Sequence, residues 1–162
     1  VLTIESFNII NVIKESISLY SKRDNKKTFK LSLHSESFII QADEQKLRQV
    51  FNNLIKNALD ATANSTAPII NITTSNLRIN NKAYIELTIS DNGQGFEPDI
   101  VGNAFEPYVT TKTKGKGLGL AIAKHIIEEH MGHIELTNKK TQGASVIIIL
   151  PVLQPKKDRP NE

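Results

Sequence analysis

The alternation of hydrophobic and polar residues divides the chain into helices and strands. Apolar residues recur at roughly helical spacing over residues 6–21, which predicts an amphipathic helix. Two short β-like pieces follow at 28–33 and 37–41. A second amphipathic helix is predicted over about 44–62, with Asp43 as its N-cap.

The second half of the chain contains predicted strands in pairs. After a turn-rich break, the predicted elements are strands near 69–76 and 83–90, a helix at about 117–130, and strands at 133–138 and 144–150. The link at Asn80-Asn81 is typical of a hairpin. The whole pattern predicts an α/β sandwich of the α+β kind, in which one mixed sheet carries helices on one face. Residues 91–116 lack a sustained period, and a structureless stretch of this length is usually functional or disordered.

Composition narrows the class of protein. The 162 residues suggest one domain, over about 1–153, followed by a polar tail at 154–162 that we expect to be disordered. Twenty basic and 17 acidic residues are scattered, which argues against nucleic acid as a partner. The absence of cysteine excludes disulfides, thiolate zinc sites and a cysteine nucleophile, and is compatible with a reducing cytosol. The longest apolar run, 146–150, is too short to span a membrane, and a start at Val1 suggests an excised piece of a longer protein.

The second helix carries the first candidate motif. Asn53 and Asn57 are four residues apart on its polar face, so their side chains are stacked one above the other. Asparagine is a middling helix former, so two stacked amides require an explanation. From this helix alone, a ligand site and an ordinary solvated face both remain open.

Two glycine-containing segments provide further candidates. Residues 91–95 follow a strand directly and place the carboxylate of Asp91 beside two glycines, an arrangement that suits a ligand but also a plain turn. Residues 114–120 alternate glycine with other residues and run straight into a helix, where bare N–H groups and the helix dipole attract phosphate. A flexible linker is the alternative for this second segment. Its spacing matches neither a P-loop nor a dinucleotide-binding fingerprint.

The order of these motifs resembles the GHKL ATP-binding family, which includes histidine kinases, DNA gyrase, Hsp90 and MutL. The resembling segments are the N box at 53–58, the G1 box at 91–96, the F box at 105–112 and the G2 box at 115–122. The F box, Phe-Glu-Pro-Tyr-Val-Thr-Thr-Lys, resembles histidine kinases in particular, and the nitrogen-regulation sensors among them. The resemblance covers about residues 5–151 and implies a Bergerat-type fold with a mobile ATP lid at about 96–116.

The resemblance also implies ATP and Mg²⁺ as cofactors and assigns residues to them. The implied nucleotide-binding residues are Asn53, Lys56, Asn57, Asp91, Gly93, Gly95, Lys112, Gly115, Gly117, Leu118, Gly119 and Leu120. Asp91 would accept a hydrogen bond from the adenine amino group, and Asn57 would be the magnesium ligand. Asn53, Asn57 and Lys112 would act in catalysis, although Lys114 and Lys116 are alternatives for the phosphate contact. Asp60 stands where relatives often carry a basic residue, so we leave it out.

The implied activity is that of a protein histidine kinase, which transfers the γ-phosphate of ATP to a histidine. The histidines of the chain, His34, His125, His130 and His133, lack the context of a phosphoacceptor, and we interpret the last three as structural or exposed. We therefore expect the phosphoacceptor to lie in a separate dimerisation domain of the same protein, and this piece to be monomeric. A response regulator would act downstream. The domain would be cytoplasmic, whether or not the full-length protein is anchored in a membrane.

Two other classes of protein compete with this interpretation. A GHKL ATPase or serine kinase would carry a glutamate four residues before the magnesium asparagine, where this chain has Asn53. A degenerate, non-catalytic ATP-sensing module would have lost one or more boxes, yet all four are intact. We therefore favour the kinase.

Overall fold

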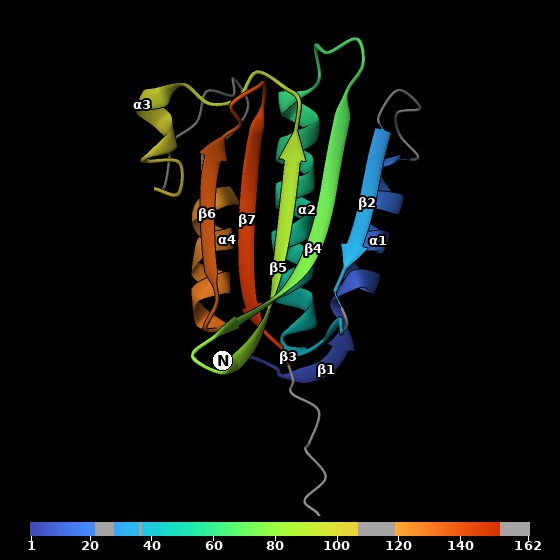
Figure 1. Cartoon of the computed structure of the whole chain (residues 1–162), viewed down its shortest axis with the longest axis vertical. Coiled ribbons are helices and arrows are strands. Elements are labelled where there is room, and N and C mark those ends of the chain that lie inside the picture. The colour runs from blue at the N-terminus through green and yellow to red at the C-terminus, as the bar shows by residue number, and fades with distance from the viewer. Residues whose placement is uncertain (22–27, 36, 107–118, 153–162) are drawn as a thin grey trace, which may run out of the picture.

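A five-stranded mixed sheet forms one layer of the computed structural model, which describes residues 1–21, 28–35, 37–106 and 119–152 (Figure 1). The strand order is β2-β4-β5-β7-β6. The strands are β2 (Thr28–His34), β4 (Ile69–Ile79), β5 (Lys82–Asp91), β6 (His133–Asn138) and β7 (Ala144–Pro151). Strands β2 and β4 are parallel, and every other neighbouring pair is antiparallel. The predicted mixed sheet is therefore confirmed, and the expected tail at 154–162 lies outside the described residues.

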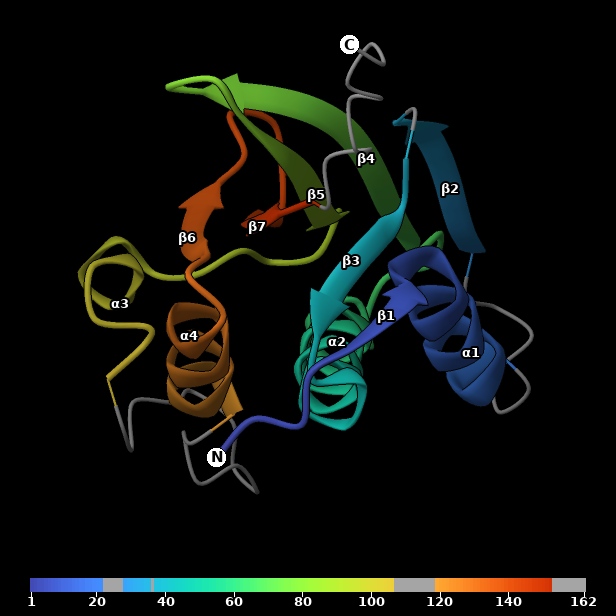
Figure 2. The same cartoon turned by 90° about the horizontal axis from the view of Figure 1, so that it is seen from below.

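Three helices cover one face of this sheet: α1 (Ile9–Ser21), α2 (Glu44–Ala61) and α4 (Gly119–Glu129) (Figure 2). The strands alternate as the sequence predicts. On β5, Ile85 and Leu87 point toward the helices and are fully buried, whereas Glu86 and Thr88 on the other face are half-buried. Helix α2 packs against both α1 and α4, so it occupies the middle of the helical layer. None of the described helices is long and apolar enough to cross a membrane.

The N-terminal segment differs from the prediction. Residues 6–8 were expected to be helical, but β1 (Glu5–Asn8) pairs antiparallel with β3 (Ile39–Ala42) in a second, two-stranded sheet. The helix begins only at Ile9, because the Asn8 side chain accepts the backbone N–H of Ile10 at 2.9 Å and so ends the strand. Pairing with β3, which is distant in sequence, makes residues 5–8 a strand instead of a helix.

The stretch from 91 to 116 is also more ordered than expected in its described part. A one-turn helix, α3 (Pro98–Val101), begins with a proline in its first turn, and Ala104 is buried. The prediction that the stretch is structureless is therefore wrong for these residues, while 107–116 lie outside the described residues. The predicted hairpin is confirmed, because Asn80 and Asn81 have φ of 50° and 63° between paired β4 and β5.

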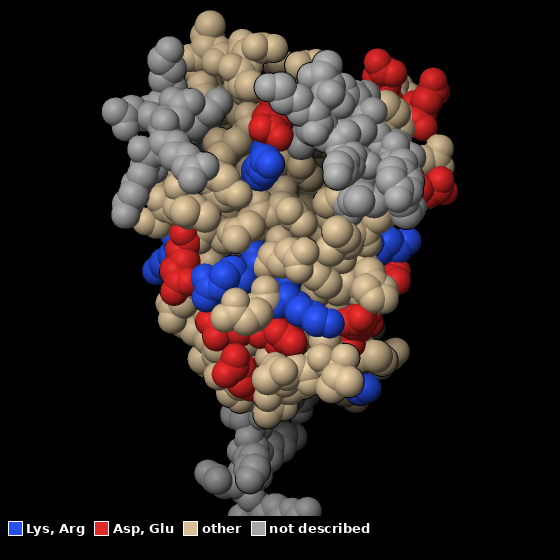
Figure 3. Space-filling model, turned by 180° about the vertical axis from the view of Figure 1, so that it is seen from behind, with Lys and Arg blue, Asp and Glu red and all other residues tan. Residues whose placement is uncertain are grey.

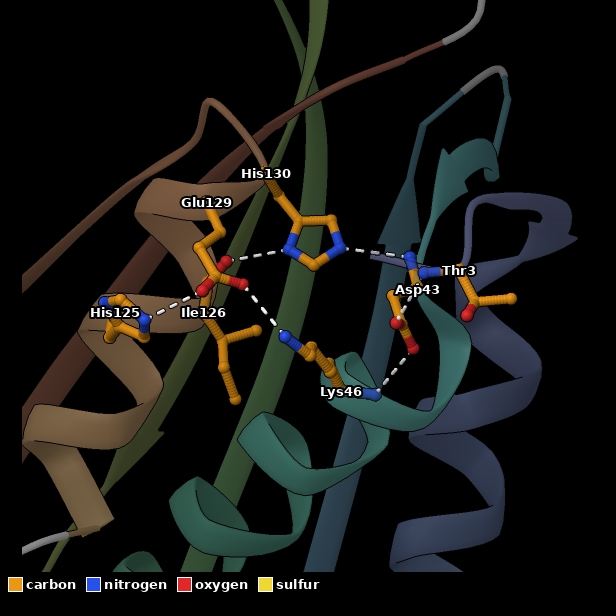
Figure 4. A network of polar contacts seen from close by, with 7 residues as sticks. All are labelled: Thr3, Asp43, Lys46, His125, Ile126, Glu129 and His130. Atoms are coloured by element: carbon orange, nitrogen blue, oxygen red, sulfur yellow. Dashed lines mark hydrogen bonds and ion pairs between the residues drawn. The ribbon is translucent and has the colours of Figure 1, made fainter. Parts of the chain in front are cut away.

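A buried histidine ties the start of α2 to the end of α4 (Figure 4). The Nε2 atom of His130 accepts the backbone N–H of Asp43 at 3.0 Å, and Nδ1–H donates to the carbonyl of Ile126 at 2.7 Å. The Asp43 carboxylate accepts the N–H of Thr3 at 2.9 Å and that of Lys46 at 3.2 Å, which confirms the predicted N-cap. These two bonds lower the pKa of Asp43. His130 is therefore structural, as expected.

Ion pairs join the three helices across their outer surface, where basic and acidic side chains lie next to one another (Figure 3). Lys46 of α2 meets Glu129 of α4 at 3.1 Å, and this hydrogen bond lowers the pKa of Glu129. Arg48 contacts both Glu15 of α1 and Glu44. All these side chains are at least 29% exposed, so each pair should contribute little to the stability of the fold.

Candidate functional site

A small cavity lies where the C-terminal half of α2, the end of β5 and the start of α4 meet. The residues around it are Leu54, Asn57, Ala58, Ala61, Ile89, Asp91, Phe96, Leu120, Ala144 and Val146. Its volume is about 30 Å³. Small-molecule sites usually measure about 300–1,000 Å³, so a large ligand can enter only if side chains at the rim move.

Asp91 is the buried carboxylate of this cavity. It is 7% exposed, and its Oδ1 accepts the backbone N–H of Gly93 at 2.9 Å. Burial raises the pKa of Asp91, although hydrogen bonds from the N–H groups of Gly93 and Ala144 and the charge of Lys139 act in the opposite direction. A buried carboxylate costs free energy unless it is fully paired. The N–H groups of Gly93 and Ala144 offset part of this cost.

The turn that follows Asp91 is fixed on both sides. A Cβ on Gly93 would lie 2.2 Å from the carbonyl oxygen of Ala61, so only glycine lets the turn pack against the end of α2. On the other side, the Asn92 side chain accepts the N–H of Ile69 and donates to the carbonyl of Ala67, both at 2.9 Å. The predicted turn is therefore real, and it also orients the carboxylate.

The two stacked asparagines of α2 are directed toward the site. Asn57 is half-buried and lines the cavity. Asn53, also half-buried, faces the first turn of α4, since its Cγ lies 3.8 Å from the position that a Cβ on Gly119 would take. Lys56 and Asp60 are exposed. A solvated polar face therefore describes these last two residues but not the asparagines.

The structure thus brings Asn57, Asp91 and Leu120 together at one cavity, with Asn53 and Gly119 beside it. Gly95 is half-buried and lies next to the side chain of Asn138. The remaining predicted residues, Lys112, Gly115, Gly117 and Leu118, lie outside the described residues.

The described part of the chain contains no group of three or more His, Cys, Asp or Glu side chains that could hold a metal ion. Magnesium usually takes only one or two protein ligands and fills its other positions with phosphate oxygens and waters. The amide oxygen of Asn57 is a hard ligand at the cavity wall, so its chemistry fits a magnesium ion that arrives with a phosphate ligand.

The sequence did not predict the part of the site that β6 and β7 contribute. The Asn138 side chain accepts the N–H of Phe96 at 2.9 Å and donates to the carbonyl of the same residue at 2.6 Å. Ala144 and Val146 line the cavity. Nothing in the local sequence marks these residues, because their role comes from contacts between distant segments.

Comparison with known proteins supports the family resemblance that the four boxes indicated. The family model described as histidine kinase-, DNA gyrase B- and HSP90-like ATPase matches residues 42–154. A sensor histidine kinase described as NtrY-like, from Rickettsia bellii (strain RML369-C), is 36% identical over 143 residues. That match covers 87% of this chain but 22% of the relative, so the chain spans about a fifth of the relative's length.

Solved structures show the same fold. The nucleotide-free catalytic domain of the histidine kinase ThkA superposes with a TM-score of 0.79 and 28% identity, over 91% of this chain and 95% of that domain. Full-length ShkA in complex with AMPPNP gives a TM-score of 0.79 and 26% identity, over 96% of this chain and 32% of ShkA. ThkA also matches in a complex with the response regulator TrrA, with a TM-score of 0.76 and 26% identity, over 96% of this chain and 43% of that one.

Proposed function

Because the chain belongs to the histidine kinase-, DNA gyrase B- and HSP90-like ATPase family, we propose that it binds Mg-ATP and donates the γ-phosphate to a histidine. The acceptor would lie in a separate dimerisation domain of a two-component sensor kinase. The observation that carries this proposal is the cavity that joins buried Asp91 to Asn57 of the N box and Leu120 of the G2 box. Three boxes from distant parts of the sequence meet there.

Asp91 would read the base. Its carboxylate is an acceptor only, which suits the exocyclic amino group of adenine. The N–H of Gly93 already holds Oδ1, so the carboxylate is oriented before the ligand arrives. Preorganisation of this kind reduces the entropic cost of binding.

The phosphates would lie toward α4. This 11-residue helix begins at Gly119, and its first N–H groups and dipole favour negative charge. Asn57 would hold the magnesium ion, which would neutralise charge on the phosphates. Asn53 would contact the phosphates from the neighbouring turn of α2. By family resemblance, Lys56, Lys112 and the backbone of Gly115, Gly117 and Leu118 would also contact the phosphates. The lid would span about residues 96–116, within a domain that would span residues 1–153.

A GHKL ATPase is the alternative activity, and Asn53 distinguishes the two. Hydrolysis needs a base to activate water, and an amide is not a base near neutral pH. A neutral imidazole already has a free lone pair, so transfer to histidine has less need of one. Asn53 is half-buried beside α4 and offers an amide where an ATPase would need a base, which supports the kinase.

The partners follow from this activity. The dimerisation domain would supply both the acceptor histidine and the dimer contacts, so the isolated piece would be monomeric and would contact no nucleic acid. A response regulator would take the phosphoryl group, as the complex of ThkA with TrrA suggests. The domain would act in the cytoplasm, where ATP is available, whether or not the full protein is anchored in a membrane.

Calorimetric titration with a nonhydrolysable ATP analogue, with and without Mg²⁺, tests the binding step. Mixing the chain with a supplied dimerisation domain and labelled ATP then tests transfer. We expect label on histidine, stable in alkali and lost in acid. Absence of binding would overturn the proposal altogether, whereas binding without transfer would favour an ATP-sensing module.

A further inference from the structure

The end of β6 holds the backbone just beyond the turn that carries Asp91. The amide of Asn138 makes two hydrogen bonds to one residue: its Oδ1 accepts the N–H of Phe96 at 2.9 Å, and its Nδ2 donates to the Phe96 carbonyl at 2.6 Å. Paired bonds of this kind satisfy both backbone groups of the residue, as a neighbouring strand would. A single side chain therefore fixes a loop residue 42 positions away in sequence.

This clasp, the pair of bonds between Asn138 and Phe96, lies at the rim of the cavity. Phe96 lines the cavity together with Asp91 and Asn57. The preceding residue, Gly95, has φ of 74°, and a Cβ placed on it would come within 3.0 Å of Asn138 Oδ1. A glycine at that position therefore lets the clasp close without strain.

The turn after Asn138 packs directly against the strand that ends in Asp91. Gly143 has φ of 98°, and a Cβ on it would lie 1.9 Å from the carbonyl oxygen of Asp91. The Lys139 N–H donates to the Gly143 carbonyl at 2.9 Å, which closes the turn. Asn138 therefore belongs to a turn that fits directly against β5, and the clasp sets where Phe96 lies relative to the Asp91 carboxylate.

We propose that Asn138 is a positioning residue for the base end of the nucleotide site. The cavity has a volume of about 30 Å³ and must widen to admit a base. With the Phe96 backbone clasped, widening needs only a side-chain movement at the rim, because the chain between Asp91 and α3 keeps its place. Without the clasp, the same backbone would have to be ordered each time a nucleotide binds. This inference rests on the proposed ATP-binding function.

The test compares nucleotide affinity in Asn138→Ala with affinity in Thr137→Ala, a matched control. Thr137 is the preceding residue of β6, is exposed, and does not line the cavity. Titration with a nonhydrolysable ATP analogue should show roughly 5- to 30-fold weaker binding for Asn138→Ala, the effect of ordering one backbone residue on binding. Thr137→Ala should bind as the parent does.

Two further measurements separate positioning from a general loss of structure. Inorganic triphosphate lacks the base, so its affinity should be the same in Asn138→Ala as in the parent. The chain contains no tryptophan, so Phe96→Trp creates a single probe at the clasp. Adding Asn138→Ala to that background should lower the fluorescence anisotropy of the probe.

The outcomes distinguish this inference from the proposed function. A parent chain that binds no ATP overturns both. A parent that binds ATP, together with Asn138→Ala that binds it equally well, overturns only the role of Asn138. Equal weakening of the ATP analogue and triphosphate, with a lower melting temperature, would assign Asn138 a purely structural role and would also overturn the inference.

Discussion

Asp91→Asn changes one side-chain oxygen to an amide nitrogen in the wall of the cavity and leaves the shape of the side chain nearly unchanged. The remaining Oδ1 can still accept the N–H of Gly93, so the turn should keep its conformation. The new NH₂ group would face the adenine amino group donor to donor. A lost or mismatched buried hydrogen bond costs about 1–3 kcal/mol, which corresponds to a roughly 5- to 150-fold weaker affinity for ATP.

The same change should not destabilise the fold at neutral pH. Burial raises the pKa of Asp91, so the folded chain binds this proton more readily than the unfolded chain does. The resulting stabilisation is complete below the ordinary Asp pKa of about 3.9 and is lost as pH rises through the raised pKa of the folded state. Asparagine shows no such loss. The stability of the variant relative to the parent should therefore increase between pH 4 and pH 7.

Two assays are needed together. Calorimetric titration with a nonhydrolysable ATP analogue gives the affinity, and thermal melts at pH 4 and pH 7 give the change in relative stability. We expect the variant to bind the analogue more weakly and, at pH 7, to melt at or above the melting temperature of the parent. Unchanged affinity with a normal melt would refute the role of Asp91 in base recognition, and a strongly destabilised variant would refute the account of its burial.

Three further predictions concern other groups. Asn57→Ala should remove the Mg²⁺-dependent part of nucleotide binding but keep base recognition, as titrations with and without EDTA would show; a retained magnesium effect would assign the ligand elsewhere. The isolated chain should release phosphate from ATP very slowly, because Asn53 offers no base; rapid release that Asn57→Ala abolishes would favour an ATPase. The hydrogen bonds that lower the pKa of Asp43 stabilise the fold above about pH 3.9, and this stabilisation is lost as the pH falls through the lowered pKa. The urea concentration at the midpoint of unfolding should therefore fall less steeply with decreasing pH in Asp43→Asn than in the parent. An unchanged acid profile would contradict the last of these.

Elements whose signals are local could be predicted from the sequence. Helix α2 was expected at 44–62 and occupies Glu44–Ala61, because its apolar face and its N-cap both lie within the segment. Strand β1 was missed, because Phe7 pairs with Ile40 and that pairing is visible only in three dimensions. The one-turn helix α3 is too short to show a period.

The candidate site divides in the same way. Asp91 and Asn57 belong to compact motifs whose residue types already indicate their chemistry, and the structure places both at one cavity. Asn138 could not be found, since an asparagine before a turn is common and its partner Phe96 is distant in sequence. The sequence therefore indicates the groups that would contact the nucleotide, but not the contact between Asn138 and Phe96 on which the proposed positioning role rests.

The first helix has a practical consequence for anyone who prepares this domain. The match to the family model starts at residue 42, yet Ile9, Ile10 and Ile13 of α1 are 0–3% exposed and complete the core beside α2. Each buried side chain of this kind contributes about 1.5–3 kcal/mol, and a domain's net stability is only about 5–15 kcal/mol. An expression fragment that starts at residue 42 would expose the apolar surface that α1 covers and would aggregate. The boundaries for cloning are therefore set by α1 and not by the residues that match the family model.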